Sequence, residues 1–462
     1  MNLENVKEKP NVIVFFTDQM RWDTTGVHGN PHGLTPNFDQ MAQNGTHVYN
    51  SFTCQPVCGP ARSCLQTGMY ATQTGCYRNG IPLPENSKTL AHYFREYGFR
   101  TGYIGKWHLA SQDPVPENER GGYEYWLASN VLEYSSDAYD TIMYNNENKA
   151  VKLPGYRVDA VTDAAIRFID QNQKDPFFLF VSYLEPHHQN HLDNYPAPLG
   201  YDCTAAGTWM PPDLAALGGS AAQHLPGYYG MVRKLDEAFG RLLDSLRSLK
   251  LLEYTVVLFT SDHGNHFKTR NAEYKRSCHD SSIRVPTVFQ GPGFDGGGRI
   301  HKLVSLMDLP PTLLDAAGIP VPEHMQGKSI LPLCRKTGSD WANEVFVQIS
   351  EDKVARAIRT DRWKYSVTAK ERSGWLHSGS DVYEEEFLYD LHADPYELNN
   401  LIGVEWYRQV TEQLRETLLQ RMEDAGESKP AIVPSPARVS AVDRRVEITE
   451  LRDHTINWTY PE

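Results

Sequence analysis

Short runs of β-branched and aromatic residues recur along the first 290 residues of the chain. Between them lie two patterns typical of helices: residues 90–97, followed by Gly98, and residues 228–249, whose apolar positions form one stripe. Strands that alternate with helices predict an α/β fold, with a large, mostly parallel sheet flanked by helices. The predicted buried strands are Val12–Thr17, Thr101–Gly105, Phe177–Ser182, Thr255–Ser261 and Val285–Gln290.

Polar clusters follow directly on four of these predicted strands. In open α/β sheets, ligands bind beyond the carboxyl ends of the strands. We therefore expect the four clusters to line one crevice. They are Asp18-Gln19, Lys106-Trp107-His108, Glu185-Pro186-His187-His188 and Asp262-His263-Gly264.

The rest of the chain divides into an insertion and a second, smaller unit. Residues 111–160 have little periodicity, which indicates an insertion over the sheet edge. A Pro- and Gly-rich stretch near residues 318–333 marks the exit from the large domain. Short strand patterns and a helix then predict a smaller C-terminal α+β subdomain built on an antiparallel sheet. We expect a catalytic domain at 1–342, this subdomain at 343–426 and an extended tail at 427–462.

Composition limits the partners and the location of the protein. The net charge of −13 argues against nucleic acid and anionic membrane, because both are bound mainly by Lys and Arg. No apolar run is long enough to span a bilayer. The N-terminus lacks the features of a secretory signal, so we expect a cytoplasmic protein as numbered. A periplasmic or secreted location applies if a leader has been removed.

The seven cysteines form no paired or zinc-binding spacing, and one of them stands out. Pro60 is suited to the first turn of a helix, which we expect to run through Leu65 and to end at Gly68. Cys58 then lies at the positive N-terminus of this helix, where an anion is favoured. A thiolate at this position is already a potential nucleophile.

The same segment resembles a known family signature. Cys58-x-Pro60-x-Arg62, followed by Leu65, Thr67 and Gly68, resembles the motif of type I, formylglycine-dependent sulfatases of the alkaline-phosphatase-like superfamily. Other parts of the chain are similar to motifs of that family. They are Asp18, Lys106-Trp107-His108, Pro186-His187, Asp262-His263, Lys275 and two C-terminal segments around Lys364 and Asp390.

The resemblance implies an alkaline-phosphatase-like fold and a sulfuric ester hydrolase that acts on sulfate monoesters. It implies that Cys58 becomes 3-oxoalanine (formylglycine) through transient contact with a formylglycine-generating enzyme. The hydrated aldehyde, a geminal diol, would then attack sulfur. The implied catalytic residues are Cys58, Arg62, Lys106, His108, His187 and Lys275.

The resemblance also implies one divalent cation beside the nucleophile. Its ligands would be Asp18, Gln19, Asp262, His263 and residue 58. The chain has Gln19 and His263 where many relatives carry Asp and Asn. Oxygen donors favour calcium, which we expect, or magnesium, and a histidine nitrogen leaves manganese open.

Several alternatives stay open at this point. Asp18 and Asp262 are also typical helix N-caps. His188 is an alternative to His187 as the general acid. Lys268, Arg270 and Arg276 are alternatives to Lys275 as the sulfate-binding cation. Another member of the superfamily, a phosphonate or phosphodiester hydrolase, is one alternative function, and a non-catalytic carbohydrate-binding protein is another. The pair Lys106 and His108 favours the sulfatase. Three aromatic residues suited to stacking on a sugar ring favour a sulfated carbohydrate: Trp126, Tyr134 and Trp375. The sequence predicts no oligomeric state.

Overall fold

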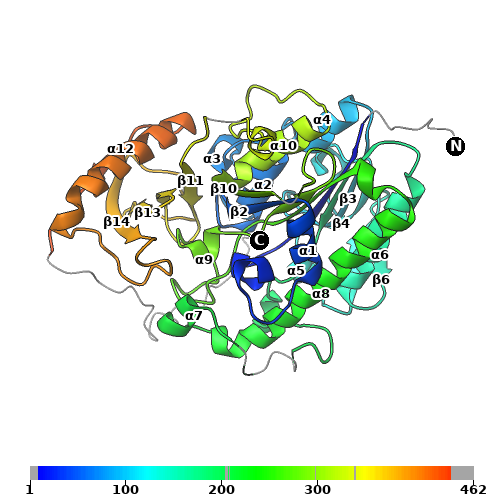
Figure 1. The fold of residues 1–462 in the computed structure, drawn as a ribbon, viewed down its shortest axis with the longest axis horizontal. Coiled ribbons are helices and arrows are strands. Elements are labelled where there is room, and N and C mark those ends of the chain that lie inside the picture. Colours follow the sequence, from blue (N-terminus) through cyan, green and yellow to red (C-terminus); the bar gives the residue numbers. More distant parts are fainter. Residues whose placement is uncertain (1–8, 203–206, 208, 297, 338–339, 439–462) are drawn as a thin grey trace.

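A computed structural model describes residues 9–202, 207, 209–296, 298–337 and 340–438. Within these ranges the chain forms two β-sheets with helices around them (Figure 1). The large sheet has ten strands in the order β10-β2-β9-β8-β1-β7-β3-β4-β5-β6, and the small sheet has five in the order β11-β12-β13-β14-β15. The predicted fold class, a large α/β unit with a smaller C-terminal sheet, is confirmed.

Four parallel strands form the centre of the large sheet. β1 (Asn11–Thr17) pairs with β7 (Phe177–Ser182) on one side and with β8 (Thr255–Ser261) on the other. β3 (Arg100–Lys106) pairs in parallel with β7. These strands were predicted from sequence to within a residue of their ends. Because they all run in the same direction, the polar clusters that follow them come out at one edge of the sheet.

The central strands are buried on both faces, because alternate side chains point to opposite sides. From β1, Ile13 and Phe15 pack into one core and Val12, Val14 and Phe16 into another. Figure 1 shows long helices on one face and shorter ones on the other. The first core is covered by α1 (Pro36–Asn44), α6 (Arg157–Gln171) and α8 (Ala221–Ser248), and the second by α2 (Cys58–Thr67), α4 (Leu90–Glu96) and α10 (Leu309–Ala316).

Two predicted elements differ in length from those observed. The predicted helix at 228–249 begins earlier, at Ala221, and includes Pro226. Buried Leu225 and Tyr228 add core contacts that offset the hydrogen bond lost at the proline. The predicted strand at 285–290 is only β9 (Val288–Gln290), and it runs antiparallel to β8. Sequence periodicity did not reveal β2 (Thr46–Phe52), which pairs with β9, or β10 (Gly298–Ser305), which pairs with β2.

The insertion at 111–160 extends the large sheet. β4 (Tyr125–Ser129) pairs in parallel with β3, and β5 (Thr141–Tyr144) and β6 (Ala150–Leu153) follow as an antiparallel pair. The short helix α5 (Leu132–Ser135) lies between β4 and β5. Because α5 follows the carboxyl end of β4, this insertion reaches the same edge as the four polar clusters.

The small sheet lies between a helix and the large domain. α12 (Arg408–Asp424) packs on one face through Leu414 and Leu418, and Phe52 and Ile283 of the large domain pack on the other. All its strands pair antiparallel except β14 and β15. Residues 439–462 of the predicted tail lie outside the described residues. The strands are β11 (Glu344–Ile349), β12 (Ala355–Thr360), β13 (Trp363–Thr368), β14 (Val382–Asp390) and β15 (Ala431–Val433).

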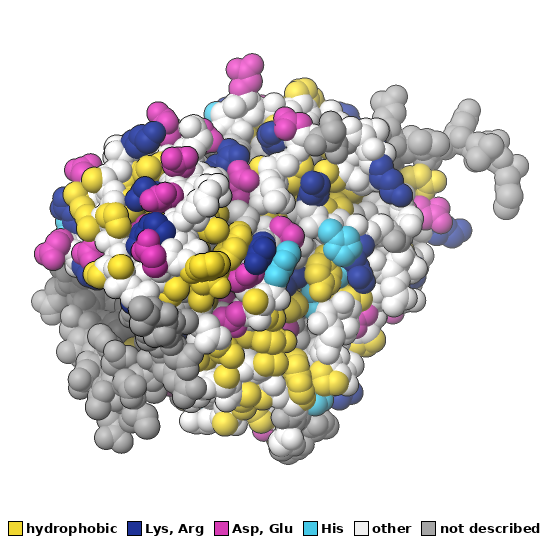
Figure 2. All heavy atoms as spheres, turned by 60° about the vertical axis from the view of Figure 1, so that its left-hand side comes forward, with side chains coloured by type: hydrophobic (Ala, Val, Ile, Leu, Met, Phe, Trp, Pro, Cys, Tyr) yellow, Lys and Arg dark blue, Asp and Glu magenta, His cyan; other side chains and the backbone are white. Residues whose placement is uncertain are grey.

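Four short helices complete the described part of the fold: α3 (Ala71–Thr74), α7 (Pro212–Leu217), α9 (Asp280–Ile283) and α11 (Leu331–Cys334). Across the described ranges, we find no helix with the length and apolar character that crossing a membrane requires. On the face shown in Figure 2, acidic and basic side chains are interspersed. The negative net charge is therefore not gathered into one patch on this face.

Candidate active site

Four side chains from three parts of the chain meet at the carboxyl edge of the large sheet. Asp18 follows β1, Asp262 and His263 follow β8, and Cys58 begins α2. One potential ligand atom from each lies within 4.8 Å of the others, and all four residues are buried. Cys58 Sγ is 3.2 Å from His263 Nε2 and 3.6 Å from Asp18 Oδ1.

Helix α2 forms where the sequence predicted it. Val57 is extended and precedes the helix, Pro60 lies in its first turn, and Gly68 ends it with a φ of 72°. The backbone N–H of Gly59 donates to Asn79 Oδ1 at 2.9 Å, which satisfies one free donor at the N-terminus. The remaining positive field of the helix end acts on residue 58.

The two aspartates are arranged for a shared site and cap no helix. Asp262 Oδ1 accepts hydrogen bonds from the backbone N–H groups of Gln19 and His263, at 2.9 and 2.8 Å. Arg62 Nη2 bridges the two carboxylates, at 2.9 Å from Asp18 Oδ2 and 3.3 Å from Asp262 Oδ2. Burial and the neighbouring Cys58 raise the pKa of the Asp18 carboxyl, but Lys106, His187 and Arg62 outweigh them and hold that pKa well below its usual range. Asp18 is therefore ionised despite being buried.

The donor set fits a divalent cation. Gln19 Oε1 is buried and has no hydrogen-bond partner within the described residues, and the residue is held at a φ of 68°. His263 Nδ1 lies 2.9 Å from the Gly264 carbonyl oxygen, which accepts its hydrogen bond, so Nε2 is the ring nitrogen that faces Cys58 and the two aspartates. Two carboxylates, an amide oxygen and an imidazole nitrogen are ligands that calcium, magnesium and manganese accept.

Two lysines bring positive charge to the surroundings of Cys58. Lys106 Nζ lies 2.8 Å from both Asp18 Oδ2 and Glu133 Oε1. Lys275 Nζ lies 2.8 Å from Cys58 Sγ and 3.2 Å from His187 Nε2. Although burial raises the pKa of the Cys58 thiol, Lys106, Lys275 and His263 hold that pKa well below its usual value. The site is therefore suited to binding an anion.

The adjacent histidines after β7 face different surroundings. His187 Nδ1 contacts the His188 carbonyl oxygen at 2.7 Å, and its Nε2 lies 3.2 Å from Lys275 Nζ. The ring of His188 stacks on that of His187 at 4.3 Å and lies 4.5 Å from the Tyr274 ring. Burial lowers the pKa of His188 well below its usual value, so this ring is neutral.

The structure separates Lys275 from the other cations in its segment. Lys268 pairs with Asp193, and Arg270 donates to the carbonyl oxygens of Tyr396 and Glu397. Arg276 pairs with Glu273 and Glu351. Of these candidates, Lys275 is the one that contacts Cys58.

Glu133 is the main site residue that sequence reasoning missed. It lies in α5, and its Oε1 contacts Lys106 and lies 3.9 Å from His108 Nδ1. The surrounding segment has no motif or periodicity, so no local signal pointed to it. Ser182, which accepts a hydrogen bond from Arg62 Nη1 at 2.7 Å, was predicted only as the end of a strand.

The candidate sugar-stacking residues lie in three different environments. Trp126 is fully buried against Tyr103 and Trp107, so the prediction that it stacks on a substrate is wrong. Tyr134 directly follows Glu133 and is 45% exposed. Trp375 is half-buried in a loop of the small domain. Tyr134 and Trp375 therefore remain candidates for stacking on a sugar ring.

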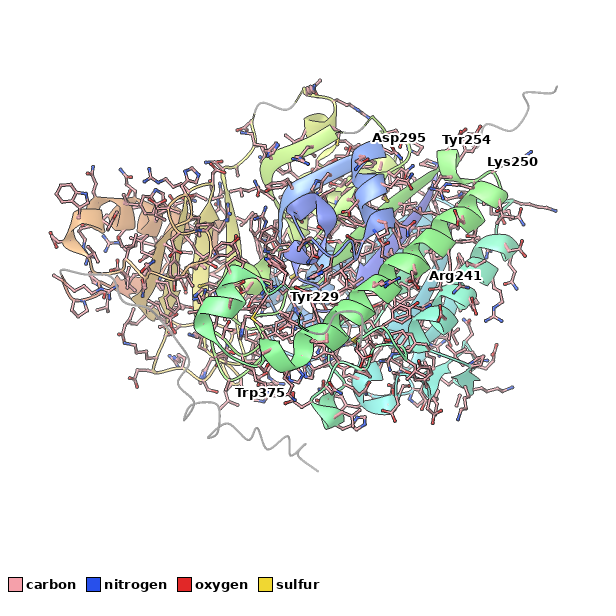
Figure 3. The ribbon with its side chains drawn as sticks, turned by 60° about the horizontal axis from the view of Figure 1, so that its bottom comes forward. Tyr229, Arg241, Lys250, Tyr254, Asp295 and Trp375 are labelled. Carbon is pink, nitrogen blue, oxygen red and sulfur yellow. The ribbon has the colours of Figure 1, made fainter. Side chains whose placement is uncertain are left out.

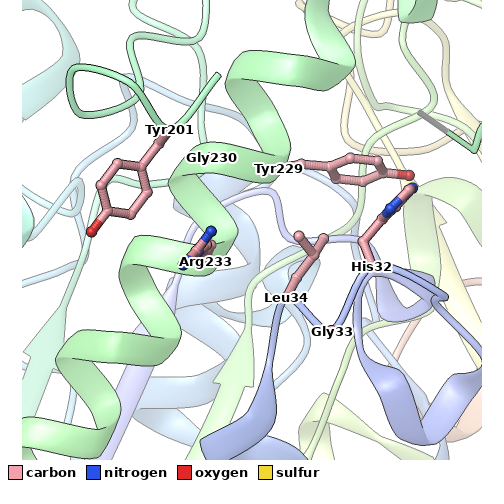
Figure 4. A pocket seen from close by; sticks show the side chains of 7 residues that line it. All are labelled: His32, Gly33, Leu34, Tyr201, Tyr229, Gly230 and Arg233. Atoms are coloured by element: carbon pink, nitrogen blue, oxygen red, sulfur yellow. The ribbon is translucent and has the colours of Figure 1, made fainter. Parts of the chain in front are cut away.

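A separate hollow lies between helix α8 and the loop at residues 32–34 (Figure 4). Its described lining includes none of the predicted catalytic or metal-binding residues. The candidate active site is therefore the cluster at the edge of the large sheet, not this hollow. The lining residues are His32, Gly33, Leu34, Tyr201, Tyr229, Gly230 and Arg233.

Comparison with known proteins shows the family of the chain. The family model described as Sulfatase matches residues 10–319, which hold every predicted site residue. The chain belongs to the sulfatase family. A second model, described as the C-terminal part of N-sulphoglucosamine sulphohydrolase, matches residues 272–424. Members of the family are sulfuric ester hydrolases, and the fold and site of this sulfatase suit that reaction.

Curated relatives match the sulfatase over most of its length. It is 30% identical to the ulvan-active sulfatase of Formosa agariphila over 91% of this chain and 82% of the relative. It is 24% identical to N-acetylglucosamine-6-O-sulfatase of Bacteroides thetaiotaomicron, over 92% and 88% of the two chains.

Solved structures confirm the alkaline-phosphatase-like fold. A putative sulfatase, yidJ, from Bacteroides fragilis matches with a TM-score of 0.79 and 24% identity, over 92% of this chain and 98% of that one. Phosphonate monoester hydrolase of Agrobacterium radiobacter matches with a TM-score of 0.68 and 21% identity, over 95% and 100%. Likeness at this level shows the shared fold alone.

Proposed function

We propose that this sulfatase hydrolyses sulfate monoesters of a carbohydrate, with formylglycine formed from Cys58 as its nucleophile. We further propose one divalent cation, calcium, held by Asp18, Gln19, Asp262, His263 and residue 58. The observation that carries the proposal is the position of Cys58 Sγ, 2.8 Å from Lys275 Nζ and 3.2 Å from His263 Nε2 at a helix N-terminus. Such a nucleophile requires a formylglycine-generating enzyme as a transient partner.

The residues around position 58 have distinct roles in this proposal. An aldehyde at residue 58 supplies, when hydrated, a hydroxyl that attacks sulfur and a second hydroxyl that later releases sulfate. A bound cation supplies charge that offsets the sulfate oxygens. Arg62 fixes the two aspartates, while Lys106, His108 and Lys275 donate hydrogen bonds to the sulfate group and the nucleophile. His187 protonates the oxygen of the leaving alcohol.

Charge in the site favours an anionic ester. The buried carboxylates Asp18, Asp262 and Glu133 are matched in number by the cations Arg62, Lys106 and Lys275. A divalent cation bound beside them would add positive charge, which the anion of a sulfate monoester offsets.

A carbohydrate is supported by the relatives and by the rim of the site. One relative is named as ulvan-active and another as an N-acetylglucosamine-6-O-sulfatase. The protein BT4656, which has a TM-score of 0.75, was solved in complex with its substrate D-glucosamine-2-N,6-O-disulfate. Tyr134 and Trp375 are exposed or half-exposed aromatic residues of the kind that stack on sugar rings.

Two measurements test the proposal. Peptide mass spectrometry on active protein should find the aldehyde at position 58, and wild type should hydrolyse nitrophenyl sulfate faster than a nitrophenyl phosphonate. Cys58→Ala should remove both activities. An unmodified thiol in fully active protein would contradict the proposed nucleophile. Faster turnover of the phosphonate would favour a phosphonate hydrolase, and no turnover of either would favour a non-catalytic carbohydrate-binding protein.

A further inference from the structure

Arg78 is a cation without an acidic partner near the nucleophile of a strongly acidic protein. In the described part of the chain, no carboxylate lies within ion-pairing distance of its guanidinium. Its Nη1 donates to the carbonyl oxygen of neighbouring Asn79 at 2.9 Å, and its buried Nε has no partner among the described residues. Leaving a partly buried guanidinium in this state is unfavourable, unless a ligand supplies the missing anion.

The backbone of Arg78 is tied to the nucleophile's helix. Asn79 Oδ1 accepts from the N–H of Gly59, the residue after Cys58, at 2.9 Å. The backbone N–H of Asn79 donates to Glu351 Oε1 at 2.7 Å. Arg78 is therefore adjacent in sequence to a residue that contacts the start of α2.

The small domain holds the Arg78 side chain. The guanidinium carbon lies 4.8 Å from the ring centroid of Trp375, which is labelled in Figure 3. The loop that carries Trp375 is fixed at both sides, because Glu351 N donates to the Gly374 carbonyl at 2.9 Å and Arg356 Nη2 to the Ser378 carbonyl at 2.6 Å. A cation over an aromatic face keeps its in-plane N–H groups available as donors.

Glu351 connects this arrangement to the catalytic lysine. Its carboxylate pairs with Arg276, the residue after Lys275, and is only 3% exposed. One buried carboxylate of the small domain thus contacts both the segment of Arg78 and the segment of Lys275. Hydrogen bonds and an ion pair through Glu351 therefore fix the backbone next to Arg78 relative to the segment of Lys275. A side chain held on such a fixed backbone loses little freedom when it binds a ligand group.

We propose that Arg78, held by Trp375, binds a second anionic substituent of the substrate. This inference rests on the proposed function and narrows it to saccharides that carry, besides the scissile sulfate, a carboxylate or another sulfate. The planar donor edge of arginine matches both groups.

The test compares wild type and Arg78→Met on four sulfates. Nitrophenyl sulfate and a neutral monosulfated sugar have one anion, whereas a disulfated hexosamine and a monosulfated disaccharide with a uronate have two. For the doubly anionic substrates, kcat/KM in Arg78→Met should fall ~10- to 100-fold relative to that for nitrophenyl sulfate, mainly through KM. Trp375→Leu should lower kcat/KM for the doubly anionic substrates relative to that for nitrophenyl sulfate as well, but by a smaller factor. Loss on one doubly anionic class alone identifies which anion Arg78 binds.

A matched pair in the small domain serves as the control. Arg362 also lies 4.8 Å from a tryptophan ring, that of Trp363, but it is paired with Asp390 at 2.7 Å. Arg362→Met should leave the substrate ratio unchanged. If Arg78→Met lowers kcat/KM for all four sulfates equally, or for none, the proposal is wrong.

Binding separates this inference from the proposed function. In a Cys58→Ala background, calorimetry with the same saccharides should show weaker binding of the doubly anionic ones when Arg78 is also replaced. If wild type hydrolyses no sulfate, the proposed function fails, and the binding comparison still decides the role of Arg78. Equal affinities with and without Arg78 would overturn the inference even in an active sulfatase.

Discussion

At the scale of single residues, the two histidines after β7 provide the sharpest test of the chemistry. His187 Nε2 faces Lys275, whereas the ring of His188 is stacked behind it. A general acid matters most for a basic leaving group. His187→Ala should therefore slow hydrolysis of a sugar sulfate by roughly a hundred- to ten-thousand-fold, and slow nitrophenyl sulfate far less. Steady-state kinetics on both substrates measure this difference.

His188→Phe is the matched control, because a phenyl ring preserves the stacking on His187. This variant should show no dependence on the leaving group. If His188→Phe shows the dependence and His187→Ala does not, the assignment is off by one residue. If His187→Ala slows both substrates equally, His187 binds sulfate and does not donate a proton.

Glu133 is expected to limit the positive charge of the site. Its Oε1 contacts Lys106, and its buried Oε2 has no partner among the described side chains and backbone groups. Glu133→Gln removes one negative charge close to the bound sulfate while keeping a similar shape. The dianion of free sulfate should then bind more tightly, by roughly tenfold or more given an attraction of a few kcal/mol at this distance. Inhibition constants for inorganic sulfate measure the change, and an unchanged constant would contradict this role.

At the scale of elements, one buried lysine joins the two sheets. Lys364 on β13 is fully buried and pairs with Asp280 of α9 at 2.5 Å and with Glu397. Removing it deprives the buried carboxylates of Asp280 and Glu397 of the cation nearest to them, so Lys364→Met should lower the free energy of unfolding by about 3–5 kcal/mol. Lys370→Met, which removes an exposed pair with Glu384, should cost less than about 1 kcal/mol. Denaturant titrations compare the two.

The same cluster predicts a loss of stability in acid. Burial raises the pKa of Asp280, but Lys364, Arg359 and Arg284 outweigh burial and depress that pKa below its usual value. In the unfolded chain the carboxyl titrates near pH ~3.9. The stabilisation is therefore complete above that pH and is lost as pH falls toward the folded-state pKa. In Asp280→Asn, the free energy of unfolding should fall less steeply with pH between about pH 5 and pH 2, as measured by denaturant titrations. An unchanged pH dependence would refute the assignment.

At the scale of the whole molecule, a bound cation should join loops from separate strands. Its proposed ligands follow β1 and β8 and begin α2, so the cation stabilises the folded state alone. Removal by chelator should lower both activity and the thermal midpoint, and re-addition of calcium should restore both. A cation at a hundredfold excess over its dissociation constant contributes about 2.7 kcal/mol. A metal-free protein with full activity and an unchanged midpoint would contradict the site.

The central sheet and most of the site could be predicted from the sequence, because their signals are local. Buried parallel strands are continuous apolar runs, and the motif from Cys58 to Gly68 lies within one helix. Parallel strands also bring their carboxyl ends together regardless of the details of packing. Asp18, Lys106, His187 and Asp262 thus came to one edge from the strand pattern alone.

Only the tertiary structure decided what depends on contacts between distant segments. Glu133 contacts Lys106 because the insertion adds strands to the sheet edge, and Trp375 contacts Arg78 because the small domain packs on the segments before and after α2. Neither contact has a spacing in sequence that marks it. The resemblance had already named His187 and Lys275, but the contacts of Lys275 with Cys58 and of His187 with Lys275 likewise depend on side-chain direction in the folded protein. Periodicity and motifs report local backbone preference, whereas packing between elements determines which polar groups face one another.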